Sequence, residues 1–136
     1  MALFNPVVGL VFPYWYLWGS QANDGEQSGR KPRPALIIAV SPPATGPTSV
    51  AVSPFTTVSA DLSRLATNEY MEAFPNWGAG LPTFPCWLIL NEQNIFIWPG
   101  YDLTDNPEPY GKISGTVLRG ILTQIHNLNT VPISRD

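Results

Sequence analysis

Residues 33–57 read RPALIIAVSPPATGPTSVAVSPFTT. Two apolar runs in this stretch, at 34–40 and 49–54, are rich in Val, Ile and Ala, and residues 41–47, which contain Pro and Gly, separate them. This pattern predicts two buried strands joined by a turn. Because the connection is short, we expect the two strands to be neighbours in one sheet.

Shorter strand-like runs flank this pair. We expect a first strand with an irregular or edge portion within 7–18, where aromatic and β-branched residues are interrupted by two prolines. A long polar segment, 19–31, follows and predicts a mobile loop. Beyond the central pair, a single helical turn is expected at 61–66 and a further strand at 69–74.

The last third of the chain changes from strand to helix. The runs 87–90 and 95–98 are separated by four polar residues, so they predict a tight hairpin. Apolar residues then recur at three- and four-residue steps through 114–127, which predicts an amphipathic helix. Short strands followed by one terminal helix indicate a mainly β protein with a C-terminal α-helix, a small antiparallel barrel or curled sheet. At 136 residues, we expect a single domain over 1–136.

Composition narrows the possible functions. The single Cys and single His give little support for a metal site and exclude an intramolecular disulfide, so we expect a reducing, cytoplasmic location. The apolar stretch 7–18 is too short to span a bilayer and has no basic leader, so no membrane association is expected. A net charge of −3 argues against a general nucleic-acid binder, so any anion site must be local.

The scarce cations gather at one place. Only seven Lys and Arg occur in the chain, and Arg30, Lys31 and Arg33 lie just before the first buried strand. Arg33 stands between two prolines, which restrict its backbone, and a fixed guanidinium can clamp a phosphate and stabilise charge during its transfer. The alternative is an ordinary surface arginine that pairs with Asp24 or Glu26.

Other polar and aromatic residues are candidates for the same site. Thr56 and Thr57 follow the second buried strand, and Thr56 is expected near Arg33, although both hydroxyls could simply cap the following turn. Glu26 could act as a base, hold Arg33 in place, or be a solvated loop charge. Of the aromatic residues at 14–18, those on one face should be core and the others, including Trp18, could stack bases.

These residues resemble the PemK/MazF family of toxins from bacterial toxin–antitoxin pairs. The resemblance rests on the glycine-bearing acidic loop 25–29, the Arg-Pro-Ala start of the aliphatic strand 33–38, and the strand 50–57 that ends Pro-Phe-Thr-Thr. A block at 92–103, read together with Trp87 and residues 16–18, is similar to a PemK-like subfamily. The resemblance implies an SH3-like small barrel, a homodimer, and a cognate antitoxin as partner.

The resemblance also implies an activity. It is that of a metal-independent and cofactor-independent endoribonuclease that cuts single-stranded RNA by attack of a 2′-hydroxyl on its own phosphate. Arg33 and Thr56 match the catalytic arginine and threonine, and Glu26 falls on the acidic loop position. Arg30, Lys31, Thr57 and Trp18 would bind RNA. The alternative is a non-catalytic binding module on the same fold, such as a gyrase-inhibiting toxin or a phage or plasmid interaction protein.

Overall fold

The computed structural model describes residues 5–16, 33–41, 48–56, 70–82, 84–98, 108–128 and 132–134. Two predicted segments lie wholly outside these ranges, the mobile loop at 19–31 and the helical turn at 61–66. Of the predicted turn at 41–47, only residue 41 is described. The elements are β1 (Leu10–Tyr14), β2 (Arg33–Ser41), β3 (Ser49–Thr56), β4 (Tyr70–Ala73), a 3-10 turn η1 (Pro75–Trp77), β5 (Cys86–Ile89), β6 (Asn94–Ile97), β7 (Gly111–Lys112), α3 (Gly115–Leu128) and β8 (Ile133–Ser134).

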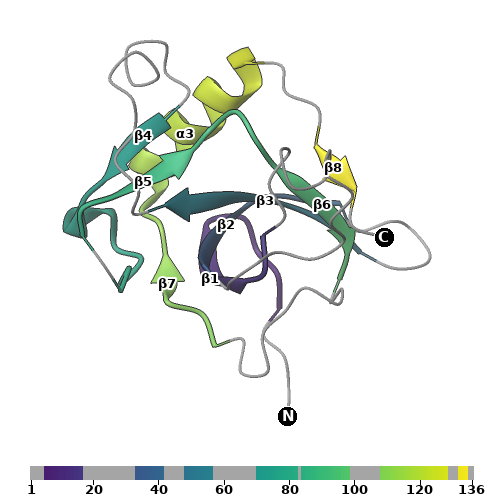
Figure 1. Ribbon diagram of the computed structural model, residues 1–136, viewed down its shortest axis with the longest axis horizontal. Helices are drawn as coiled ribbons and strands as arrows, with labels where there is room; N and C mark the ends of the chain where they lie inside the picture. The colour runs from purple at the N-terminus through teal and green to yellow at the C-terminus, as the bar shows by residue number, and fades with distance from the viewer. Residues whose placement is uncertain are drawn as a thin grey trace.

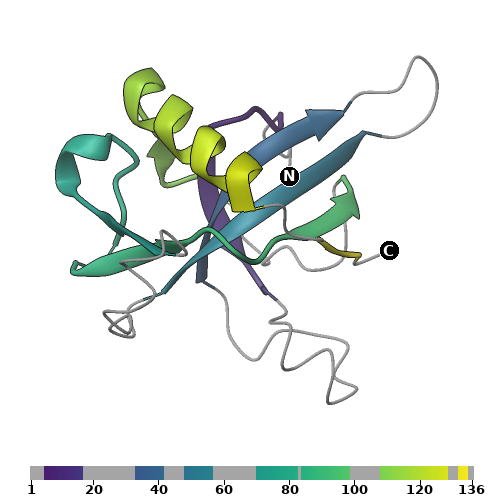
Figure 2. The same ribbon diagram turned by 90° about the horizontal axis from the view of Figure 1, so that it is seen from above.

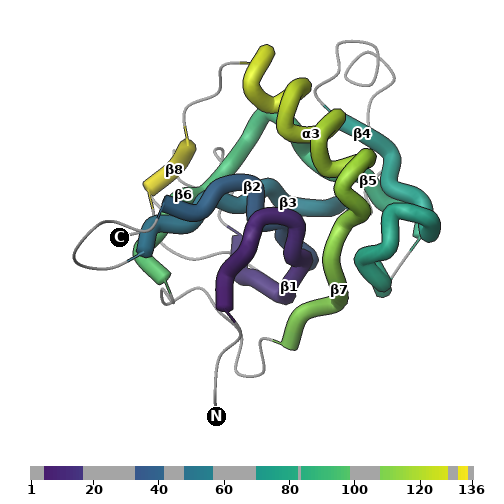
Figure 3. Tube along the Cα trace, turned by 180° about the vertical axis from the view of Figure 1, so that it is seen from behind, coloured from purple at the N-terminus to yellow at the C-terminus, as the bar shows by residue number. Residues whose placement is uncertain are grey.

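The strands form one curled, largely antiparallel sheet, a half-barrel. Within the described residues its order is β4-β5-β3-β2-β1-β7, and β6 also pairs with β3 and with the parallel strand β8. β5 and β6 pair with different ends of β3, so β4 and β5 lie at one end of that strand and β6 and β8 at the other (Figure 1). Seen from behind, β7 runs beside β1 and leads the chain into α3 (Figure 3). The mainly β class with a C-terminal helix is as predicted.

The central pair of strands carries the expected antiparallel register with one irregularity. Ala35 lies opposite Pro54 and Ile37 opposite Val52, whereas Ala39 lies opposite Ala51. Residue 38 is thus an extra residue on β2, a β-bulge that shifts the register by one. The two strands are longer than predicted, since β2 begins at Arg33 and β3 ends at Thr56.

The predicted hairpin between 87–90 and 95–98 is wrong. Both segments form strands, but β5 and β6 each pair with β3, at opposite ends of that strand. The link between them is held in place by Gln93, whose buried side-chain nitrogen Nε2 donates to the Leu90 carbonyl oxygen at 2.8 Å and to Ser53 Oγ at 3.3 Å. These bonds fix the link against β3, so the four polar residues do not form a hairpin turn.

Two apolar clusters lie on the two faces of the sheet. The helix α3 covers one face (Figure 2), where Ile121 is fully buried among residues such as Val11, Leu36 and Leu88. The helix begins and ends one residue later than predicted. The second cluster lies on the opposite face and consists of Phe12, Tyr14, Tyr16, Ala35, Ile37, Val50, Val52 and Phe96. No helix in the described part of the chain is long and apolar enough to cross a membrane.

Candidate functional site

Arg33 and Thr56, which are 23 positions apart in the sequence, stand at the same end of the central strand pair. The Ala35–Pro54 register, continued by two residues, places Arg33 beside Thr56. Residues opposite each other in an antiparallel pair direct their side chains to the same face. That face is the one away from α3, because Arg33 alternates in step with Ala35 and Thr56 with Val52.

The alignment extends across five strands. Tyr14 lies opposite Arg33, Thr56 lies opposite Trp87, and Trp87 lies opposite Glu72. We call Tyr14, Arg33, Thr56, Trp87 and Glu72 the cross-strand row. It places a cation, a hydroxyl, an indole and a carboxylate side by side on one face of the sheet.

Burial sets the electrostatic character of Arg33. Its Nε atom is buried, and the loss of hydration lowers the pKa of Arg33 below its ordinary value. The side chain nevertheless stays protonated, because the ordinary pKa of arginine lies far above neutral pH. Thr56 is only 8% exposed. The cation and the hydroxyl are therefore both partly shielded from solvent, so charges interact more strongly there than in open water.

A second polar pair, which the sequence did not reveal, lies over the same face. Glu92 lies in the link between β5 and β6, which Gln93 holds against Ser53 of β3, near Thr56 along that strand. Tyr16 independently supports this placement, because burial and then the nearby Glu92 carboxylate raise the pKa of Tyr16 well above its ordinary value. The Tyr16 hydroxyl thus remains protonated beside a carboxylate.

Aromatic packing braces this end of the face. The rings of Tyr14 and Tyr16 meet edge to face at a centroid distance of 6.4 Å, and Tyr14 stacks on Phe96 at 5.2 Å. Because β1 and β6 lie on either side of β2 and β3, these contacts close the sheet into a concave surface. The aromatic residues Tyr14 and Tyr16 are core, as expected for one face of the first strand.

Several predicted site residues lie outside the described ranges. They are Glu26, Arg30 and Lys31 of the first loop, Trp18 before it, and Thr57 after β3. Of the predicted set, the structure describes Arg33 and Thr56 and brings these two together. Glu92 was not predicted as a site residue, because the residues around it were interpreted as a hairpin turn. The one feature of the sequence that could have pointed to it is an acidic residue between two strand-like runs.

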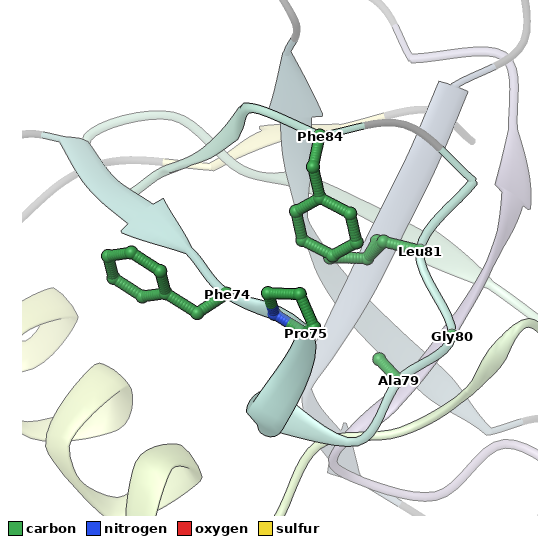
Figure 4. A pocket seen from close by; sticks show the side chains of 6 residues that line it. All are labelled: Phe74, Pro75, Ala79, Gly80, Leu81 and Phe84. Carbon is green, nitrogen blue, oxygen red and sulfur yellow. The ribbon is translucent and has the colours of Figure 1, made fainter.

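A pocket of about 100 Å³ lies elsewhere, in the segment that connects β4 to β5, and is lined by Phe74, Pro75, Ala79, Gly80, Leu81 and Phe84 (Figure 4). None of these side chains carries a polar group, so they offer nothing for proton transfer or phosphate binding. His126 is exposed on α3. Cys86 is a buried free thiol whose pKa is raised by burial and then by Glu72, so it is no activated nucleophile.

No three His, Cys, Asp or Glu side chains in the described ranges are grouped so as to hold a metal ion. Comparison with protein-family models, with curated protein sequences and with solved structures finds no significant match to this chain.

Proposed function

We propose that this protein is an endoribonuclease toxin of the PemK/MazF type that cleaves single-stranded RNA. The observation that carries the proposal is the register of β2 and β3, whose Ala35–Pro54 pair, continued by two residues, sets Arg33 beside Thr56. A guanidinium donates hydrogen bonds to two oxygens of a phosphate at once, and a neighbouring hydroxyl donates to another oxygen of the same phosphate. A ribonuclease that uses the substrate's own 2′-hydroxyl needs such donors around a phosphate.

The proposed reaction is an internal transfer of the phosphoryl group. The RNA 2′-hydroxyl attacks the adjacent phosphorus, the bond from phosphorus to the 5′-oxygen breaks, and a 2′,3′-cyclic phosphate and a 5′-hydroxyl result. Arg33 stabilises the additional negative charge on the phosphorus oxygens as the new bond forms, and Thr56 donates a hydrogen bond to one of them. Because the nucleophile belongs to the RNA, the chain itself needs no activated serine or cysteine.

Two proton transfers complete this chemistry. The 2′-hydroxyl must lose a proton and the 5′-oxygen must gain one. We assign the acceptance of the first proton, a role that Glu26 was expected to fill, to Glu92 in the link that is held against β3. Solvent water supplies the proton that the 5′-oxygen gains. The nearby Tyr16, whose raised pKa keeps its hydroxyl protonated, adds no second negative charge beside that carboxylate.

The proposal extends to partners and location. Following the resemblance, we propose a cognate antitoxin that blocks the RNA surface, a homodimer, and action in the cytoplasm. Among the alternatives, a non-catalytic module on the same fold would bind a partner through this face without breaking RNA. Only the enzyme requires Arg33 and Thr56 to act on one phosphate.

Mapping the products of a long RNA tests the proposal. Purified protein is incubated with the RNA in EDTA, and the ends of the fragments are identified by ligation and by phosphatase sensitivity. We expect cuts at a short recurring sequence, with 2′,3′-cyclic phosphate and 5′-hydroxyl ends. RNA that is bound but left intact would favour the non-catalytic module, and fragments with 5′-phosphate ends would contradict the mechanism.

A further inference from the structure

Two members of the cross-strand row take no part in the proposed chemistry. Trp87 lies directly beside Thr56, and Glu72 lies directly beside Trp87. Neighbouring strands are about 4.8 Å apart, so the Glu72 backbone stands about 10 Å from that of Thr56. This is comparable with the reach from an RNA phosphate to the base edge of an adjoining nucleotide.

Trp87 presents a hydrocarbon surface at this position. Its side chain is partly exposed, while its indole nitrogen Nε1 is buried and has no hydrogen-bond partner among the described residues. The polar edge of the indole is therefore turned into the protein, and the part that solvent reaches is carbon. An exposed aromatic carbon surface beside a phosphate site is suited to stacking an unpaired base.

Glu72 presents a different chemistry one strand further. Its side chain is exposed, and a carboxylate at neutral pH only accepts hydrogen bonds. Of the four RNA bases, only guanine offers two adjacent N–H donors, N1–H and the N2 amino group, on its Watson–Crick edge. Adenine, cytosine and uracil each place an acceptor next to their donor, which a carboxylate repels.

We propose that Trp87 and Glu72 form a base-recognition subsite that selects guanine in the nucleotide next to the cleaved phosphate. Trp87 stacks the base, and the Glu72 carboxylate accepts both N–H groups. The inference rests on the proposed function for the position of the phosphate, but base recognition can be measured without cleavage. Neither residue is assigned a part in the phosphoryl transfer.

The test uses short 2′-fluoro RNA oligonucleotides, which lack the attacking hydroxyl and cannot be cut. Four sets differ only in whether the base beside the central phosphate is G, A, C or U, and binding is followed by fluorescence anisotropy of an attached dye. The proteins are the wild type, Glu72→Gln, Trp87→Phe and Trp87→Ala. Glu108→Gln, which changes an exposed glutamate outside the cross-strand row, is the control.

We expect the wild type and the Glu108→Gln control to bind the G oligonucleotide at least about tenfold more tightly than the others, the discrimination typical of a bidentate contact. Glu72→Gln should lose most of this preference without weaker binding of the other three. Trp87→Ala should weaken the binding of all four oligonucleotides about equally, by roughly fivefold or more. Trp87→Phe should keep much of the wild-type affinity, because an aromatic ring remains for stacking.

The outcomes separate this inference from the proposed function. A wild type that cleaves RNA but shows no preference for G, or a Glu72→Gln variant that keeps the preference, would overturn the subsite and leave the function intact. A Glu72-dependent preference in a protein that never cleaves RNA would support the subsite and contradict the ribonuclease. Failure of all four oligonucleotides to bind would overturn the subsite.

Discussion

Arg33 combines a partly buried position with a permanent charge. The sequence suggested an exposed cation before the strand, but the structure makes Arg33 the first residue of β2, with its Nε buried. Burial of the charge opposes its ionised form, as the lowered pKa of Arg33 indicates.

We predict that Arg33→Ala lowers the cleavage rate by about 10²-fold or more, the loss typical when a preorganised donor to a reacting oxyanion is removed. The same change should not lower the midpoint of urea unfolding appreciably, because it removes a desolvated charge. Arg33→Lys keeps the positive charge but loses the planar guanidinium. Its cleavage rate should lie between those of the wild type and Arg33→Ala. Cleavage at the wild-type rate by a folded Arg33→Ala protein would remove this residue from the mechanism.

The raised pKa of Tyr16 predicts how the stability of the protein depends on pH. Its pKa is raised in the folded protein, first by burial and then by Glu92, so the folded state holds the phenol proton more tightly than the unfolded state does. This contribution to stability is complete below the ordinary tyrosine pKa of about 10 and is lost progressively as the pH rises above that value. The free energy of unfolding should therefore fall above about pH 10.

Tyr16→Phe should flatten this alkaline decline, since its ring cannot ionise. Urea unfolding followed between pH 8 and 11 measures the effect, with Tyr110→Phe as a control for the loss of a phenol elsewhere. An alkaline slope that is as steep in Tyr16→Phe as in the wild type would show that other groups cause it.

At the scale of elements, the β-bulge in β2 decides which threonine joins Arg33. The pairs nearest the connecting turn, such as Ser41 with Ser49, would place Arg33 beside Thr57 if their register continued unchanged. The extra residue at 38 shifts the register by one and brings Thr56 there instead. The sequence predicted the neighbouring strands and the threonine pair, but an inserted residue inside a uniformly apolar run leaves no mark in the pattern.

The placement of Glu92 shows another limit of prediction from sequence. The apolar runs correctly predicted strands at β5 and β6, because their period and composition are local properties. Which strands pair is a property of the whole sheet, and here β3 is long enough to accept both β5 and β6 along one edge. The residues that link them, Glu92 included, therefore run along that edge of β3.

The segment after η1 depends on glycine at a defined backbone conformation. Gly80 has a φ of +63°, and a Cβ added there would lie 2.7 Å from the Tyr110 carbonyl oxygen. This close approach fixes residues 78–80 against the strand that leads into α3. Gly120, in contrast, is an exposed helical position with nothing within 4 Å of an added Cβ.

We predict that Gly80→Ala destabilises the fold by about 1–3 kcal/mol, because both the backbone conformation and the Tyr110 oxygen oppose the methyl group. Gly120→Ala should stabilise it by about 0.5–1 kcal/mol through helix propensity alone. Urea unfolding of the two variants beside the wild type measures both signs. A neutral Gly80→Ala would mean that the 78–80 segment can move away from Tyr110 at little cost.

At the scale of the whole molecule, few positive charges are available to bind RNA. The net charge is −3, and three of the seven Lys and Arg lie at 30–33. Affinity must then come from a few local phosphate contacts together with stacking on aromatic side chains. Both sources are present along the cross-strand row, in Arg33 and in Trp87.

This charge distribution predicts a shallow salt dependence. With at most about three phosphate contacts, the slope of log K against log salt concentration should be about −2 or shallower for single-stranded RNA. Titration of an uncleavable 2′-fluoro oligonucleotide at several salt concentrations measures the slope. A value steeper than about −4 would indicate a more extensive basic surface than these cations provide.

The central claim is that Arg33 and Thr56 act together on one phosphate, and a double-mutant cycle of cleavage rates tests it most directly. Single-turnover rates are measured for the wild type, Arg33→Ala, Thr56→Val and the double variant on one RNA. Residues that act as a unit are strongly non-additive, so the double variant should cleave little more slowly than Arg33→Ala alone. Losses that simply multiply, or a Thr56→Val protein with full activity, would contradict the claim.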